Sequence, residues 1–147
     1  METQSHTEMI RAPIDTCFDT LVDFAKYPDW FSGISSARID ESDAAAGLWS
    51  VCYELNMVIK TIGYTLDYRS RRPEELTWKL GTGDVNDVVG SYTLRAIDDR
   101  TTEATCTQAI DIGFWIPGPL KRTFEKSALA DSVREFKKAA EDAAGTS

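Results

Sequence analysis

Four carboxylate side chains lie inside segments of alternating polarity, a position from which acid–base chemistry is conceivable. They are Glu54, Asp67, Asp87 and Asp111. A carboxylate in an apolar pocket has a raised pKa, so it could carry protons during enolisation of a bound ketone. Each of the four has the opposite parity to its apolar neighbours, however. An outward-facing position on a sheet is therefore the simpler interpretation.

The histidine and cysteine content limits the other kinds of chemistry. His6 is the only histidine, and Cys17, Cys52 and Cys106 are widely separated and form no Cys-x-x-Cys pair. Neither a Ser-His-Asp set nor a Cys-His dyad is indicated, and we expect no metal site. Scattered, unpaired cysteines favour reduced thiols in a reducing compartment. Because no apolar leader is visible at the N-terminus, we expect a cytoplasmic protein.

Large aromatic residues are the strongest candidates for binding. Six lie on strand-like segments at the apolar parity: Trp49, Tyr53, Tyr64, Tyr68, Trp78 and Tyr92. Trp30 and Trp115 lie on connections. Core packing is one interpretation. The other is a ligand pocket, because tyrosine and tryptophan combine an apolar body with a polar group that needs a partner when buried.

Basic residues stand out because the chain is acidic, with a formal net charge of -8 at pH 7. They cluster in two places, Arg71-Arg72 and Lys121-Arg122. Either they bind an anionic group of a ligand at a pocket mouth, or they pair with surface carboxylates. The overall acidity disfavours nucleic-acid binding, which needs a basic face. No apolar run is long enough for stable membrane insertion.

The elements that must position these residues follow from periodicity and turn residues. Polarity alternates in seven segments, of which the last six follow one another with short turns: 5–11, 34–42, 48–57, 59–70, 75–81, 85–97 and 102–114. Alternation with a period of two predicts strands, and the short turns predict an antiparallel meander. GTGD at 81–84 joins two of these strands, so we interpret it as a hairpin turn.

Helical periodicity occurs at two places. One is near the N-terminus, where an apolar face of a helix is formed by Ile14, Phe18, Leu21, Val22 and Ala25. The segment YPDWFSG at 27–33 follows it and predicts a short turn or one-turn helix. A long helix is expected over about 118–144. Between it and the last strand, FWIPG at 114–118 makes a stiff corner, so Phe114 and Trp115 either pack there or line a pocket rim.

The order of elements predicts an α+β protein in which a curved seven-stranded antiparallel sheet wraps around a long C-terminal helix, with two short helices between strands 1 and 2. This order resembles the START-like superfamily, also called SRPBCC or helix-grip proteins. Several strings resemble its polyketide cyclase/dehydrase family, in particular uncharacterised bacterial members. The strings are APIDTCFDTLVDFAKYPDWFSGI (12–34), YTLDYRSRRPEELTWKL (64–80), GSYTL (90–94) and TEATCTQAIDIGFWIPGPLKRTFEKSAL (102–129).

The resemblance covers nearly the whole chain and implies a single domain over residues 1–147, of which we expect about 144–147 to be disordered. It implies a deep, mainly apolar cavity between sheet and C-terminal helix, and no obligatory cofactor. On this basis we predict a ligand-binding set, which comprises Trp30, Tyr53, Tyr64, Arg69, Trp78, Tyr92, Trp115 and Phe124. The expected partner is a hydrophobic small molecule, and the protein is expected to be a monomer or homodimer.

The resemblance also implies that an arginine near the end of the strand 59–70 faces the cavity and holds a polyketide oxygen. Arg69 or Arg71 matches that position, whereas simple alternation places Tyr64 and Tyr68 inward instead. The sequence lacks the tyrosine and the helical amide that aromatase/cyclases of the family carry.

Three functions remain open. The first is binding of a lipid-, polyketide- or aromatic-like molecule. The second is cyclase or dehydratase chemistry, in which Arg69 or Arg71 polarises a ketone and Tyr64 or Tyr92 donates a proton. The third is a protein-interaction module with a vestigial cavity.

Overall fold

The computed structural model describes residues 2–56, 60–115 and 126–145. Seven antiparallel strands form one sheet in the order β1-β7-β6-β5-β4-β3-β2, so the predicted meander is confirmed, with β1 added at the β7 edge. The strands are β1 (Thr3–Ile10), β2 (Ser36–Asp43), β3 (Leu48–Asn56), β4 (Thr61–Arg71), β5 (Glu75–Gly83), β6 (Asp87–Asp98) and β7 (Thr101–Asp111).

The predicted short helices lie between β1 and β2. They are α1 (Ile14–Val22) and α2 (Tyr27–Trp30), and one 3₁₀ turn, η1 (Phe24–Lys26), connects them. Pro13 precedes the first turn of α1, where its missing N–H costs no hydrogen bond. A second 3₁₀ turn, η2 (Ala44–Ala46), joins β2 to β3 and ends at Gly47, whose φ of 72° suits glycine.

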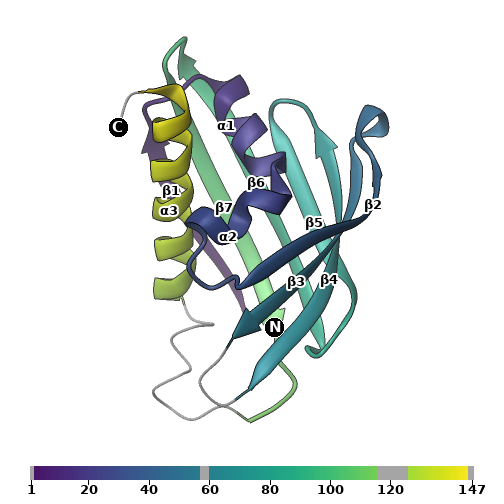
Figure 1. Ribbon diagram of the computed structural model, residues 1–147. Coiled ribbons are helices and arrows are strands. Elements are labelled where there is room, and N and C mark those ends of the chain that lie inside the picture. Colours follow the sequence, from purple (N-terminus) through teal and green to yellow (C-terminus); the bar gives the residue numbers. More distant parts are fainter. Residues whose placement is uncertain (1, 57–59, 116–125, 146–147) are drawn as a thin grey trace.

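The C-terminal helix α3 spans Lys126–Ala144 within the described residues, and the start predicted at 118 lies outside them. It buries Leu129, Val133, Phe136 and Ala140. Figure 1 shows α3 along β1 at one side of the sheet, while β2, β3 and β4 curve away from it. None of the described helices has the length and apolar character needed to span a bilayer.

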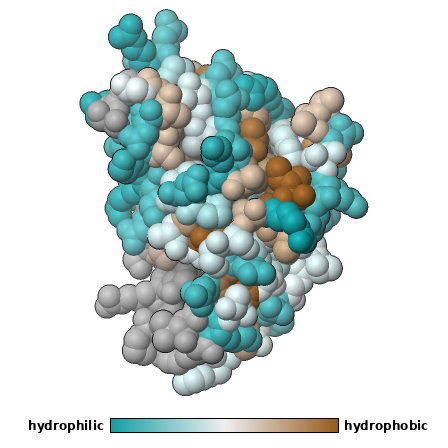
Figure 2. Space-filling model, in the orientation of Figure 1, coloured by the Kyte–Doolittle hydropathy of each residue, from teal (hydrophilic) through white to brown (hydrophobic). Residues whose placement is uncertain are grey.

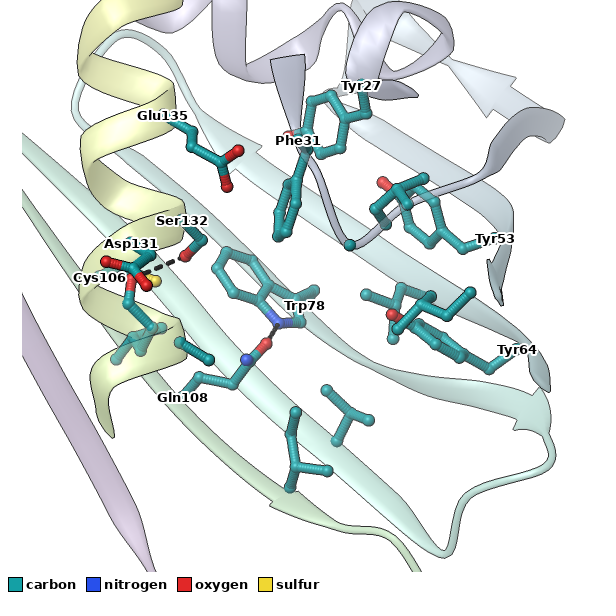
Figure 3. A pocket seen from close by; sticks show the side chains of 18 of the residues that line it. Tyr27, Phe31, Tyr53, Tyr64, Trp78, Cys106, Gln108, Asp131, Ser132 and Glu135 are labelled. Carbon is teal, nitrogen blue, oxygen red and sulfur yellow. Dashed lines mark hydrogen bonds between the residues drawn. The ribbon is translucent and has the colours of Figure 1, made fainter. Parts of the chain in front are cut away.

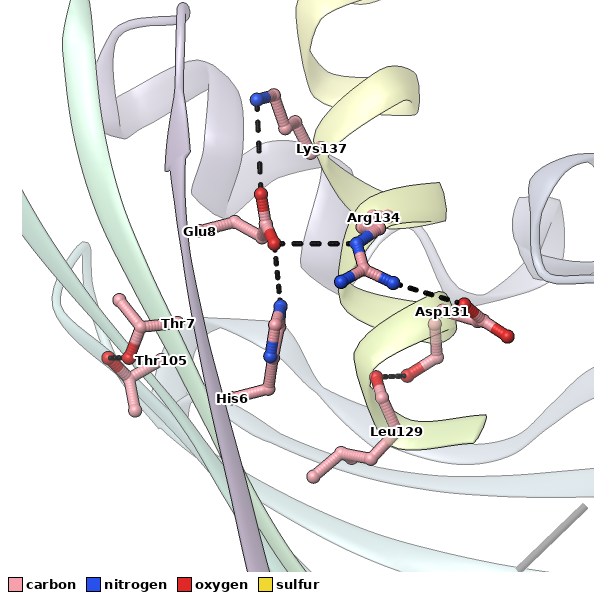
Figure 4. Close-up of polar contacts among 9 residues, drawn as sticks. His6, Thr7, Glu8, Thr105, Leu129, Asp131, Arg134 and Lys137 are labelled. Atoms are coloured by element: carbon pink, nitrogen blue, oxygen red, sulfur yellow. Dashed lines mark hydrogen bonds and ion pairs between the residues drawn. The ribbon is translucent and has the colours of Figure 1, made fainter. Parts of the chain in front are cut away.

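Polar contacts attach α3 to β1 and to the residue that follows it. Glu8 of β1 accepts a hydrogen bond from His6 at 2.6 Å, and its carboxylate lies 3.6 Å from Arg134 and 3.9 Å from Lys137 of α3 (Figure 4). At the other end, the Arg11 backbone N–H donates to Glu141 at 2.9 Å. These contacts orient the helix along the strand, so its apolar face is directed inward.

Inward-facing side chains of the sheet form a single apolar cluster with the helices. Most of the apolar side chains are therefore hidden in the space-filling view, where polar residues dominate the described surface and apolar ones form small patches (Figure 2). The register between β4 and β5 shifts at Thr65/Leu66, where β5 has Gly81 as an extra residue. Such a bulge increases the local twist and curvature of a sheet, which deepens the concave face.

Trp78 on β5 occupies a position that only glycine on the neighbouring strand permits. Gly90 of β6 pairs with Trp78, and a Cβ atom at residue 90 would overlap three atoms of the indole ring. The ring therefore lies over the Gly90 backbone, and its Nε1–H donates to Gln108 Oε1 of β7 at 3.0 Å.

We predict that Gly90→Ala lowers the free energy of unfolding by about 1–3 kcal/mol, the usual cost of overpacking a core. The added methyl group must displace the indole and break its bond to Gln108. Urea unfolding followed by circular dichroism measures the change. Gly33→Ala is the control, since its new methyl group would meet no atom closer than 3.7 Å. Equal stability of the two variants would contradict the described packing.

Candidate functional site

A cavity of about 570 Å³ lies between the concave face of the sheet, the α2–β2 connection and α3 (Figure 3). This volume is within the range of about 300–1,000 Å³ that is typical of small-molecule sites. The described residues that surround it include eight aromatic side chains from α2, the connection after it and four strands. These are Tyr27, Trp30, Phe31, Tyr53, Tyr64, Tyr68, Trp78 and Tyr92.

Five residues of the predicted binding set border this cavity. They are Trp30, Tyr53, Tyr64, Trp78 and Tyr92. In β4, the residues that face the cavity are those that simple alternation predicts to point inward. Leu66 and Tyr68 are both buried on this face. The aromatic residues thus form a wall of the cavity and a part of the core at once.

Arg69 and Arg71 do not border the cavity, so the inward placement implied by the resemblance is wrong for this chain. Arg69 is exposed on the outer face of the sheet, where it lines a separate groove with Asp67 and Thr77. Arg71 is exposed too, and its guanidinium lies 3.8 Å from the Glu75 carboxylate. Their parity is opposite to that of Tyr68, which places them on the other face of β4.

Arg72 and the two described residues of the corner after β7, Phe114 and Trp115, also do not border the cavity. Arg72 pairs with Asp19 at 2.7 Å, so a surface ion pair is what the structure shows there. Trp115 is 79% exposed and does not border the cavity. Phe114 packs partly against the core, with Lys60 Nζ 4.3 Å from its ring centre. Phe124, Lys121 and Arg122 lie outside the described residues.

Some cavity residues were missed by sequence reasoning. Gln108 has the same parity as Cys106 and Ile110 on β7, so the alternation that predicted this strand could have found it. Ser132 and Glu135 of α3 also border the cavity. The helical periodicity places Ser132 near the apolar face of the helix, whereas no sequence signal marked Glu135.

The buried polar groups of the cavity wall satisfy one another. The Tyr53 and Tyr68 hydroxyls share a hydrogen bond of 2.8 Å, and the Tyr27 hydroxyl donates to the Leu21 carbonyl at 2.6 Å. In contrast, the half-buried Tyr64 hydroxyl has no hydrogen-bond partner among the described residues. Tyr64 can therefore donate to or accept from a bound molecule without breaking a bond to any described residue.

Burial determines the ionisation state of the cavity. It raises the pKa of the tyrosines that surround the cavity, Tyr27, Tyr53, Tyr64, Tyr68 and Tyr92. It raises the pKa of the Cys106 thiol to about 12, although a contact with Tyr92 partly offsets this. The tyrosines and Cys106 are therefore neutral at physiological pH, since their charged forms lose hydration in the apolar surroundings.

The carboxylates considered for acid–base chemistry lie elsewhere. Asp67 accepts a hydrogen bond from Ser50 at 2.9 Å on the outer face, and Glu54, Asp87 and Asp111 are exposed. At the cavity edge, Glu135 of α3 instead accepts hydrogen bonds from the Ser32 backbone N–H at 3.1 Å and the Ser32 hydroxyl at 3.2 Å. This pair of bonds links α3 to the connection between α2 and β2.

Comparisons with solved structures identify the same architecture in other proteins. The protein TTHA0849 from Thermus thermophilus matches with a TM-score of 0.78 and 12% identity, over 97% of each chain. A START superfamily protein from Mycobacterium smegmatis matches with a TM-score of 0.76 and 15% identity, also over 97% of each. The Zhui aromatase/cyclase from Streptomyces sp. R1128 has a TM-score of 0.67 and 16% identity, over 97% of this chain and 87% of its own.

At these identities the structural matches establish the fold, which is the helix-grip fold of the START-like superfamily. No curated protein sequence matches the chain significantly. A family model described as "Polyketide cyclase / dehydrase and lipid transport" matches residues 1–142. Because that match spans nearly the whole chain, the protein belongs to the polyketide cyclase/dehydrase and lipid transport family.

Proposed function

We propose that the protein binds a hydrophobic small molecule in the cavity between the sheet and α3. The observation that carries this proposal is the cavity itself, whose volume of about 570 Å³ is left unfilled by the surrounding aromatic side chains. Empty apolar volume costs stability, because the lining atoms lack packing partners. A chain of this size could fill such a space with larger residues, so an open cavity favours a binding role over a protein-interaction module.

The chemistry of the wall supports a ligand that is mainly apolar but carries some oxygen or nitrogen atoms. Aromatic faces from Tyr53, Trp78 and Tyr92 provide flat contact area, and the Tyr64 hydroxyl, which no described residue bonds, can provide a directed hydrogen bond. A lipid-, polyketide- or aromatic-like molecule fits this description. Transport or storage of such a molecule needs no catalytic group.

Cyclase or dehydratase chemistry has less support from the site. The two arginines that the family resemblance assigned to ketone polarisation lie on the outer face of the sheet. Tyr64 and Tyr92 do border the cavity, but their raised pKa values make them weak acids. They are better suited to donate hydrogen bonds as neutral phenols than to transfer protons.

Ala128 of α3 offers a direct test of binding, because it borders the cavity and has little side chain. We predict that Ala128→Phe fills part of the cavity and weakens binding of the neutral fluorescent probe 1-pyrenemethanol about tenfold or more, which corresponds to about 1.4 kcal/mol. Quenching of tryptophan fluorescence by the probe measures its affinity. Mass spectrometry of solvent extracts should also find less co-purified small molecule in the variant.

Ala143→Phe is the matched control, since Ala143 lies on the exposed side of the same helix. It should bind the probe like the wild type. Circular dichroism checks that each variant is folded. The proposed function is wrong if folded wild-type protein is purified without any small molecule and also fails to bind the probe. It is wrong too if Ala128→Phe and Ala143→Phe bind the probe with equal affinity.

All five tyrosines of the chain have raised pKa values, which predicts an unusual alkaline titration. The phenols of the unfolded chain ionise near pH 10, whereas those of the folded chain stay neutral there. Above about pH 10 the unfolded state thus binds fewer protons, so stability falls as the pH rises, whereas the tyrosines leave stability unchanged below that value. Tyrosinate absorbance should rise cooperatively, together with loss of circular dichroism.

A titration in concentrated denaturant is the reference and should show ordinary ionisation near pH 10. Gradual tyrosinate formation at that pH in protein that stays folded would show that water and hydroxide reach the phenols freely. The cavity would then be wetter than the structure indicates.

A further inference from the structure

The described charged residues that border the cavity all have the same sign. Among the described residues that border it, the ones with a formal charge are Glu2, Asp131 and Glu135. Lysine, arginine and histidine do not occur in that described lining. All three carboxylates lie at the boundary with solvent, while the interior wall consists of neutral polar and apolar side chains.

Glu135 differs from the other two carboxylates because it is half-buried and held in one direction. The Ser32 backbone N–H donates to its Oε2 atom and the Ser32 hydroxyl donates to its Oε1 atom. No described cation lies within ion-pair distance of Glu135. Asp131, by contrast, pairs with Arg134 at 3.2 Å, as Figure 4 shows, and Glu2 is exposed near the chain end. Among the described residues, no cation therefore offsets the negative charge of Glu135 at the cavity edge.

Aromatic rings lie on and beside the connection to which Glu135 bonds, because Ser32 directly follows Phe31. The ring centres of Tyr27 and Trp30 are 4.9 Å apart, those of Trp30 and Phe31 are 5.6 Å apart, and those of Trp30 and Phe136 of α3 are 6.0 Å apart. In Figure 3 the Glu135 carboxylate extends from α3 toward Phe31. The faces of aromatic rings attract cations, and a fixed carboxylate adds a direct charge interaction. Together they form the chemical environment that an organic ammonium group requires.

We propose that the cavity selects ligands whose apolar body ends in an organic cation, either a protonated amine or a quaternary ammonium group, and that Glu135 determines this preference. The inference rests on the ligand-binding function proposed above. The apolar body occupies the aromatic cavity, and the cationic end lies at its edge between Glu135 and the Trp30–Phe31 pair. A carboxylate-ended ligand of the same size is rejected, because its charge meets Glu135 with no described cation in the cavity lining to compensate.

Three probes with one apolar body test the proposal: 1-pyrenemethylamine, 1-pyrenemethanol and 1-pyrenecarboxylate at neutral pH. The wild type should bind the amine about tenfold more tightly than the alcohol, and the carboxylate most weakly, as expected for a hydrogen bond between charged groups. Glu135→Gln should remove most of the amine's advantage and change the alcohol's affinity less than about twofold. Glutamine is nearly isosteric and keeps an acceptor for Ser32.

Two control variants separate the charge of Glu135 from other effects. Glu41→Gln changes the net charge by the same amount at an exposed site on β2, and should leave the amine-to-alcohol ratio unchanged. Ser32→Ala removes one hydrogen bond to Glu135 but keeps the charge, and should retain most of the preference. If Glu41→Gln lowers the amine-to-alcohol ratio as much as Glu135→Gln does, the preference comes from the net charge of the protein. If Ser32→Ala lowers it as much, the preference comes from the hydrogen bonds that link the α2–β2 connection to α3. Either result overturns the proposal.

The proposal and the underlying function fail in distinguishable ways. If the alcohol binds the wild type but the amine has no advantage, or if Glu135→Gln leaves the ratio unchanged, the cationic preference is wrong and ligand binding stands. If none of the three probes binds, the ligand-binding function and the preference that rests on it are both wrong.

Discussion

The packing of α3 along β1 is the constraint on which the rest of the structure depends. Val133 and Phe136 bury the apolar face of the helix, and the ion pairs of Glu8 with Arg134 and Lys137 hold its outer side to the strand. Because the helix is attached at this edge, it does not cover the strands that curve away on the far side (Figure 1). The cavity is the space that remains between them.

Hydrogen bonds between the side chains of its wall keep the cavity open. Tyr53 and Tyr68 share one hydrogen bond, and Trp78 bonds to Gln108 across the backbone of Gly90. Every buried side-chain nitrogen and oxygen atom of the described residues has a partner. Rings held in this way cannot collapse into the empty volume without breaking hydrogen bonds in an apolar environment, which is costly. The same side chains thus stabilise the fold and shape the proposed binding site.

Electrostatics distinguishes the two faces of the sheet. The outer face carries charged residues such as Arg69 and Lys79, which remain hydrated there. The inner face keeps neutral phenols and a neutral thiol, whose raised pKa values follow from burial. Among the described residues, the proposed site thus has uncharged hydrogen-bonding groups inside the cavity and carboxylates at its edge. This arrangement favours recognition over proton transfer.

The sequence by itself determined the elements and their order, because alternation with a period of two and helical periodicity are local properties. The same alternation placed Tyr53, Tyr64 and Trp78 on one face and favoured that face as the inner one, whereas the family resemblance implied that the face with Arg69 turns inward. Only the tertiary structure decided this, since inward orientation depends on how the sheet curves and where α3 attaches. It also brought Glu135 to Ser32, although 103 positions separate them in the chain. No local pattern encodes such a contact, so the edge of the cavity could not be predicted from the sequence.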